Sequence, residues 1–424
     1  MNSSVKLKNK GLAQNKKSRK SLLKVMFEHK FLFLFVLAQF FVGLEYSGVI
    51  MIPFFKNWGG LNQFQIQILQ SWFMLWIFIL EIPTGLIGDK IGVKFSTLFG
   101  FALKALGIFV YVTIPNFYVF LLAEFIFAIG AAFVSGSQEA WIYELAKEHD
   151  VVDYYTDMQM LLKNSFLVGL VFTSLTASFV AQYLDLRFMF GTELINLLIA
   201  LLFFAFIPKP QKDVQVELAP DYISMTKESI KVIKNNRLLI EDIVFLTVLT
   251  SLGYFVIWLY QTMMLDIGLA IKDFGIYRLI VLFSQITVGY ILARILKNKR
   301  TTRKLDVFLA FLMGTSYIVA GILQNLTGLI VYLLIAGGLG LQIRTVYSKQ
   351  LNEHIPSDKR ATVLSLISMI RKIVLVVLNP IVGALVDYKG INLLGRDFSG
   401  LYLSFLMLGF AGIVIAIYRF FRQD

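Results

Sequence analysis

The sequence predicts an all-α membrane protein with twelve transmembrane helices arranged in two six-helix bundles. Hydrophobic residues make up 57% of the 424 positions and charged residues only 16%, whereas soluble domains average about 45–50% and about 25%. The apolar residues also gather in runs of about 20, the length that a helix needs to cross a bilayer. The basic residues lie mainly in the short segments between these runs.

The apolar runs form two sets of six, separated by the polar segment 208–237. This linker has three prolines, followed by isoleucines interspersed with lysines, a pattern typical of an amphipathic helix on a membrane surface. The predicted spans are 31–55, 64–88, 95–114, 117–140, 159–183, 187–207, 238–264, 274–296, 305–323, 327–348, 361–386 and 398–418. The predicted domains are a basic tail at 1–30, a bundle at 31–207, the linker at 208–237, a bundle at 238–418 and a tail at 419–424.

The distribution of basic residues predicts the orientation of the chain. Nine Lys and Arg precede Phe31 and six lie in 208–237. The connections on the other side hold only Lys56, Arg187, Lys272, Lys389 and Arg396. Because basic loops stay on the cytoplasmic side, we expect both termini in the cytoplasm and the protein in the cell inner membrane. The net charge of +13 then indicates contact with lipid headgroups rather than with nucleic acid.

The composition disfavours catalysis and metal binding. The chain has no cysteine and three histidines, so it offers neither a thiolate metal site nor a cysteine nucleophile. It has no phosphate-binding P-loop, no His-Glu-x-x-His motif and no Gly-x-Ser-x-Gly motif. We therefore expect no enzyme activity, no cofactor and no metal, and a monomer whose partners are membrane lipids and a small-molecule substrate.

A motif of glycines and charges ends the second predicted span. It comprises Gly85, Asp89, Lys90, Gly92 and Lys94. Gly85 lets helix backbones approach closely, and Gly92 permits a tight turn. Asp89 lies at a helix end with the two lysines nearby, so the cluster can form charged contacts in one conformation and lose them in another. We interpret it as a gating motif at the cytoplasmic side.

This stretch resembles motif A of the major facilitator superfamily, whose core is G-x-x-x-D-x-x-G-R/K-R/K; only Val93 departs, where a basic residue is usual. The preceding Glu81-Ile-Pro83 is similar to a branch of bacterial drug exporters that includes tetracycline efflux pumps, as are 135–144 and 360–365. The resemblance implies two bundles that rock about a central site, with Glu144 holding Lys90 or Lys94. It also implies proton-driven export of an amphipathic or apolar compound.

Several carboxylates lie inside the predicted spans, where a lipid-facing charge costs at least about 2.5–3.5 kcal/mol. Glu45, Glu81 and Glu124 are the candidates for proton coupling, because desolvation favours the protonated form of a carboxylate. Each could instead hydrogen-bond to a neighbouring helix and serve packing alone. Glu124 and Glu193 lie toward the outer surface, so we expect both to be partly solvated.

Four further residues are candidates for the substrate cavity, namely Tyr46, Lys104, Trp258 and Arg371. The alternative for Lys104 is an ion pair with a carboxylate of another helix, and the alternative for the aromatic residues is packing or lipid contact. Two functional hypotheses stay open. The first is proton-coupled export of a small amphipathic compound. The second is proton-coupled import of a small metabolite, with Lys104 and Arg371 binding an anionic group.

Overall fold

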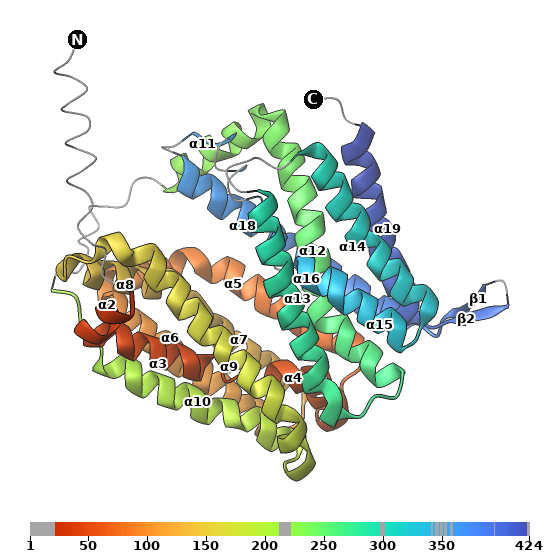
Figure 1. The fold of residues 1–424 in the computed structure, drawn as a ribbon, viewed down its shortest axis with the longest axis horizontal. Coiled ribbons are helices and arrows are strands. Elements are labelled where there is room, and N and C mark those ends of the chain that lie inside the picture. The colour runs from red at the N-terminus through yellow and green to blue at the C-terminus, as the bar shows by residue number, and fades with distance from the viewer. Residues whose placement is uncertain are drawn as a thin grey trace.

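The computed structural model of the chain is a set of long helices with one short β-hairpin (Figure 1). Eleven helical stretches of its described residues are long and apolar enough to cross a bilayer, and the shorter apolar helix Leu326–Gly340 takes the twelfth position. This confirms the predicted twelve-helix fold. The described residues are 22–211, 222–296 and 302–421, except 341, 344–346, 348–350, 352–353, 357–358 and 394.

The first bundle contains the helices that precede the linker. They are α2 (Leu22–Glu28), α3 (Lys30–Val42), α4 (Ser47–Pro53), the π-helix η1 (Phe54–Trp58), α5 (Gln63–Ile91), α6 (Val93–Tyr111), α7 (Phe117–Val134), α8 (Ser137–Glu148), η2 (Val152–Tyr154), α9 (Tyr155–Tyr183) and α10 (Leu186–Phe206).

The linker helix α11 (Tyr222–Asn235) leads into the second bundle. The remaining elements are α12 (Arg237–Asp266), η3 (Ile271–Asp273), α13 (Phe274–Ile295), α14 (Arg303–Leu323), α15 (Leu326–Tyr332), the π-helix η4 (Leu333–Gly337), α16 (Gly338–Gly340), α18 (Arg360–Val386), β1 (Ile391–Leu393), β2 (Arg396–Phe398) and α19 (Gly400–Phe421). The sequence did not predict the antiparallel β1–β2 hairpin.

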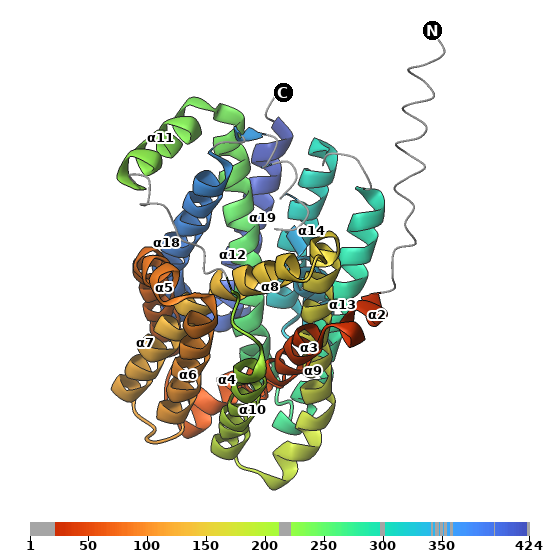
Figure 2. The same cartoon turned by 90° about the vertical axis from the view of Figure 1, so that its left-hand side faces the viewer.

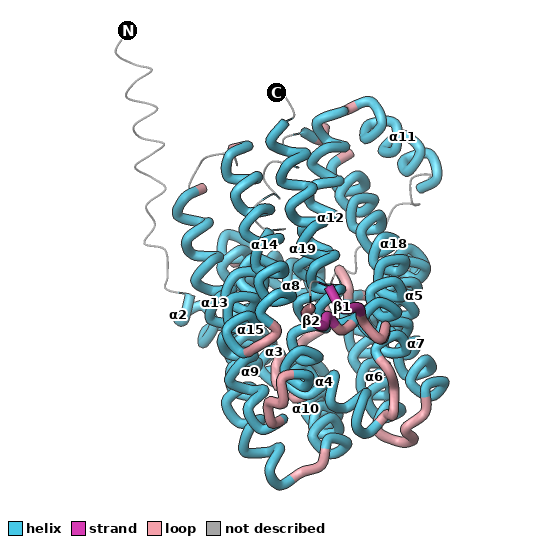
Figure 3. The backbone as a smooth tube through the Cα atoms, turned by 90° about the vertical axis from the view of Figure 1, so that its right-hand side faces the viewer, coloured by secondary structure: helices cyan, strands magenta, loops and turns pink. Residues whose placement is uncertain are grey.

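Two ends of the molecule are useful reference points. We call the end where α11 lies the linker end, and the end from which the β1–β2 hairpin projects the hairpin end (Figure 1); in Figure 3 the hairpin faces the viewer. Helix α5 runs from the hairpin end to the linker end, and α18 runs the opposite way. These two helices pack against each other, as do α9 and α13, and so hold the two bundles together.

The first transmembrane helix is broken, although the sequence predicted one continuous span over 31–55. Helix α3 ends at Val42 and α4 begins at Ser47, with Glu45 in the non-helical segment between them. The apolar run conceals the break, because the segment depends on contacts from distant helices that a local pattern does not contain. Broken helices near mid-membrane are a common way to build transport sites, since they free backbone groups for binding.

Glycines let α3 and α9 approach closely beside this break. A Cβ atom added to Gly43 would lie 2.2 Å from the carbonyl oxygen of Phe166, and one added to Gly169 would lie 2.5 Å from that of Phe40. Neither distance leaves room for a side chain. The two glycines therefore fix the position of the broken segment against α9.

The fourth span is shorter than the predicted 117–140. Helix α7 ends at Val134, and Gly136 has a φ of 81° that interrupts the helix before α8. Helix α8 then runs across the end of the bundle (Figure 2). The exporter-like stretch 135–144 thus belongs to this turn and to α8 rather than to a transmembrane helix, because a left-handed glycine ends an α-helix.

Candidate functional site

The broken segment of the first helix is held by side chains from both bundles. The carbonyl of Leu44 accepts a hydrogen bond from Asn196 Nδ2 at 2.8 Å. The carbonyl of Glu45 accepts one from Arg278 Nη1, also at 2.8 Å. A helix break leaves carbonyl groups without their usual partners, and in a membrane these must be satisfied within the protein. Arg278 was not predicted as a site residue, yet it joins the second bundle to this break.

The side chain of Glu45 lies within a group of charges beside the broken segment. One carboxylate oxygen is 3.8 Å from Arg278 Nη2. Lys104 Nζ lies 5.0 Å from the ring centroid of Phe127 and 5.3 Å from that of Phe101. Lys104 also interacts electrostatically with Glu45 and with Glu193 of α10. The structure therefore places Glu45 and Lys104 in one charged group.

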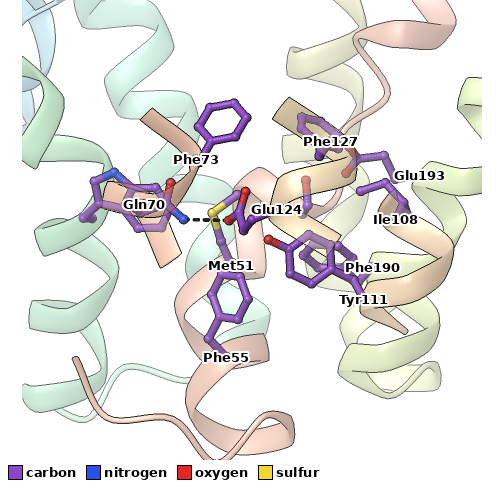
Figure 4. Close-up of a pocket in the computed structure, with 12 residues that line it drawn as sticks. Met51, Phe55, Gln70, Phe73, Ile108, Tyr111, Glu124, Phe127, Phe190 and Glu193 are labelled. Atoms are coloured by element: carbon purple, nitrogen blue, oxygen red, sulfur yellow. Dashed lines mark hydrogen bonds between the residues drawn. The ribbon is translucent and has the colours of Figure 1, made fainter. Parts of the chain in front are cut away.

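A cavity of about 160 Å³ lies beside this group. Its walls are mainly aromatic and aliphatic, and all but one of its lining residues come from the first bundle (Figure 4). Trp258, on α12, is the contribution of the second bundle. The lining residues are Ser47, Met51, Phe55, Gln70, Phe73, Ile108, Tyr111, Glu124, Phe127, Phe190, Glu193 and Trp258.

Glu124 projects into this cavity from α7. Its Oε1 accepts a hydrogen bond from Gln70 Nε2 at 3.0 Å, and the Tyr111 hydroxyl lies on its other side (Figure 4). Only 7% of Glu124 is exposed, so the expectation of partial solvation is wrong. The cause is that α7 turns this face toward the interior. Among the described residues Glu124 forms no salt bridge.

Glu193 is the second carboxylate of the cavity, and the sequence analysis did not select it for a functional role. It is 6% exposed rather than partly solvated, because its face of α10 packs inward beside Ser47. Within the described part of the chain its Oε2 has no hydrogen-bond partner. The signal that could have identified it is the one used for Glu124, an ionisable residue inside a predicted span.

Of the other predicted cavity residues, Tyr46 and Arg371 do not line this cavity. The Tyr46 hydroxyl instead lies 2.8 Å from Thr176 Oγ1 on α9. Arg371 is half-buried on α18, next to Lys372. Lys372 forms an ion pair with Glu81 of α5. Glu81 therefore lies at the contact between the bundles rather than in the cavity.

Further polar contacts join α5 to α18 in the direction of the hairpin end. Ser71 Oγ donates to the carbonyl of Val376 at 2.8 Å. At the end of the interface, Asp387 accepts hydrogen bonds from the backbone N–H groups of Gln63 and Phe64. The pair of helices thus carries polar contacts from mid-depth to the hairpin end.

The gating motif lies at the other end of α5. Gly92 has a φ of 87° and makes the turn into α6. Lys94 Nζ donates to the carbonyls of Ala205 at 2.9 Å and Ile207 at 2.6 Å, within its own bundle. Lys90 is exposed. A Cβ added to Gly85 would meet no atom of the described residues within 4 Å, so in this conformation none of them packs closely on that glycine.

The predicted contacts of two other members of the gating motif, Asp89 and Glu144, are not seen among the described residues. The side chain of Asp89 lies outside the described residues, although its backbone is part of α5. Glu144 lies on α8 and, among the described residues, forms no hydrogen bond or ion pair with Lys90 or Lys94. Nearby, a hollow of about 590 Å³ opens at the linker end, with Gly136, Glu139 and Lys163 among its lining residues.

Twelve membrane helices in two bundles around a buried polar site define a membrane transporter fold. The Major Facilitator Superfamily profile matches residues 31–379, and the chain belongs to this family. It is therefore a multi-pass membrane protein of a transporter family. No curated protein matches the sequence.

Solved structures of transporters share the fold at low sequence identity. The crystal structure of a mutant of the nucleoside transporter NupG is 14% identical, with a TM-score of 0.75 over 92% of this chain and 99% of that one. A D-xylose-proton symporter is 14% identical, with a TM-score of 0.70 over 93% and 97%. The inward open conformation of the xylose transporter XylE from E. coli is 14% identical, with a TM-score of 0.66 over 93% and 96%.

Proposed function

We propose that the protein is a proton-coupled secondary transporter that works by alternating access. The observation that carries this proposal is the cavity of the first bundle that contains the buried residues Glu124 and Glu193 and is bordered by Trp258 of the second bundle. In this fold the bundles rock about a central site and expose it to each side of the membrane in turn. Contacts between the bundles at the hairpin end, and the free surface of Gly85 toward the linker end of α5 among the described residues, support a conformation that is open toward the linker end.

The orientation of this opening follows from the charge distribution. The linker 208–237 carries six of the basic residues, and basic connections stay in the cytoplasm. We therefore place the linker end and both termini in the cytoplasm, with the protein in the cell inner membrane. The described conformation then faces inward. Closure of the linker end would bring α18 toward the gating motif and the exposed surface of Gly85.

Proton coupling is assigned to the carboxylates. Glu124 is buried without a salt bridge among the described residues, so its charged form is poorly compensated and proton binding relieves the cost. Glu45 and Glu81 each contact a cation across the bundle interface, Arg278 and Lys372 respectively. A proton on either carboxylate would weaken that contact. Proton binding and bundle movement would thereby be linked.

Export of a small amphipathic compound is our first candidate for the transport direction. Its support is the resemblance of 81–94, 135–144 and 360–365 to drug exporters. The aromatic and aliphatic walls of the cavity also suit an apolar or amphipathic substrate.

Import of a small metabolite with protons is the second candidate. The observation that favours it is the shared fold with a D-xylose-proton symporter and a nucleoside transporter. The two candidates differ in the direction in which protons move relative to the substrate. That difference is directly measurable.

The purified protein can be tested in liposomes that contain a pH-sensitive dye. Addition of a transported compound to the outside should alkalinise the lumen in the case of antiport and acidify it in the case of symport. Glu124→Gln should abolish the pH change, whereas Asp150→Asn, which removes an exposed carboxylate at a positive φ of 54°, should leave it intact. Transport that proceeds without any proton movement would overturn the proposal.

A further inference from the structure

The cavity combines two features that select for positive charge. Six of its twelve lining residues are aromatic, and two are the carboxylates Glu124 and Glu193. Aromatic faces attract cations through the negative charge of their π-systems. Buried carboxylates attract cations strongly and exclude anions, because a second negative charge in the same apolar site has no compensation.

The charges around the cavity do not balance. Glu45 and Glu193 interact electrostatically with Lys104 and Arg278. The polar neighbours of Glu124 are instead uncharged: Gln70, which donates a hydrogen bond to it, and Tyr111, whose hydroxyl lies beside it. Among the described residues, the three carboxylates Glu45, Glu124 and Glu193 are therefore accompanied by two cationic groups, Lys104 and Arg278, so a further positive charge would balance the site.

The cavity also presents an unused acceptor. Glu193 is 94% buried, given its exposed fraction of 6%, and among the described residues its Oε2 has no hydrogen-bond partner. A buried acceptor without a partner is costly unless a ligand supplies the donor. An ammonium group has up to three N–H donors and a positive charge. It can therefore donate a hydrogen bond to Glu193 and also balance the excess negative charge of the cavity.

The size of the cavity limits the body of the ligand. Its volume of about 160 Å³ is close to that of an engineered protein cavity of about 150 Å³ that binds benzene. One aromatic ring with a short arm therefore fits in this conformation. Phe127 and Phe190 come from the same two helices as the carboxylates, so a ring and an ammonium group can be bound together.

We infer that this cavity binds the ammonium group of a small organic cation with one ring-sized apolar body. The inference rests on the proposed function and names the substrate class of that site. Glu124 provides the countercharge, and the aromatic walls surround the ring. Because a proton and the ammonium group compete for the same carboxylate, binding of one weakens binding of the other.

The test is equilibrium binding to the full-length protein in detergent micelles, with empty micelles as the blank. The probes are 2-phenylethylammonium, the neutral 2-phenylethanol and the anionic phenylacetate, which share a ring and differ in charge. The ammonium should bind more tightly than either of the others. Glu124→Gln should weaken its binding about tenfold or more, as expected for a lost charged hydrogen bond, and Asp150→Asn should not.

A second measurement on the unaltered protein covers the case in which Glu124→Gln fails to fold. The affinity for 2-phenylethylammonium, measured from pH 8 down to pH 5, should fall, because a proton taken up by Glu124 removes the charge that binds the amine while the amine itself stays charged. Equal binding of the three probes, or an affinity that is independent of pH, would overturn the inference. Since no gradient is present, such a result would not bear on proton-coupled transport, which the liposome assay tests separately.

Discussion

The carboxylate of Asp387 in the second bundle accepts a hydrogen bond at 2.7 Å from the backbone N–H of Phe64 in the first. It also accepts one at 3.1 Å from the N–H of Gln63. The next N–H group, that of Gln65, donates to the Asn62 side chain at 2.8 Å. The exposed N–H groups at the start of α5 are thus satisfied partly by its own capping residue and partly by the opposite bundle.

We predict that Asp387→Ala opens the hairpin end. The substitution removes a charged cap that is formed only while the bundles are in contact there, and such caps contribute about 0.5–2 kcal/mol. An energy of that size shifts a two-state equilibrium several-fold. When the hairpin end opens, the linker end closes. Spin labels attached at Lys147→Cys and Lys304→Cys, which lie at the linker ends of the two bundles, should therefore show a larger fraction of molecules with a short distance between the labels.

The absence of native cysteine makes this labelling specific. Asp185→Ala is the matched control, because Asp185 caps α10 at Phe188 N–H, 3.0 Å away, within one bundle. It should lower stability to a similar extent and leave the distance distribution unchanged. An identical distribution in Asp387→Ala and the unaltered protein would contradict the assigned role of this contact.

Gly85→Ala should leave the fold intact and impair transport. A Cβ at this position meets no atom of the described residues within 4 Å, and alanine stabilises a helix interior by about 0.5–1 kcal/mol relative to glycine. If α18 packs on Gly85 when the linker end closes, the added methyl group obstructs that step. The melting temperature should therefore stay equal or rise while the transport rate falls. Full transport activity would show that Gly85 is not a closure contact.

Gly43→Ala, unlike Gly85→Ala, should clearly lower the stability of the protein. Its Cβ would lie 2.2 Å from the Phe166 carbonyl oxygen, and the backbone of α9 cannot move away without disturbing the packing around Gly169. Overpacking of this kind typically costs about 1–3 kcal/mol. Thermal unfolding in detergent measures the effect, with Gly85→Ala as the comparison. A melting temperature equal to that of the unaltered protein would contradict the close packing of α3 against α9.

The sequence predicted the helices well because a transmembrane helix is encoded by a continuous run of apolar residues whose length matches the thickness of the bilayer. It did not predict the break at Glu45, since the carbonyls of 44 and 45 are satisfied by Asn196 and Arg278, which are far away in the sequence. For the same reason the sequence did not predict that Glu193 lies in the cavity. Its position in the chain suggests the outer surface, and only the packing of α10 shows that it faces a cavity.

The motifs of the sequence identified the family but not the contacts of every motif residue. The family follows from 85–94, where spacing and residue type are both specific, and it is confirmed by the profile match over 31–379. The role of Glu81 could not be derived in this way. Its partner, Lys372, lies on the eleventh predicted span, and sequence spacing gives no information about contacts between bundles.

The Glu81–Lys372 ion pair should couple the two bundles energetically. Glu81 has 30% of its side chain exposed and Lys372 has 13%, so removal of one partner leaves the other charge poorly solvated. We predict that Glu81→Gln and Lys372→Met each lower stability. The double variant should lose less than the two single losses added together, by about 0.5–3 kcal/mol. Reversible unfolding in detergent would measure this difference, and strict additivity would show that the pair contributes no coupling between the bundles.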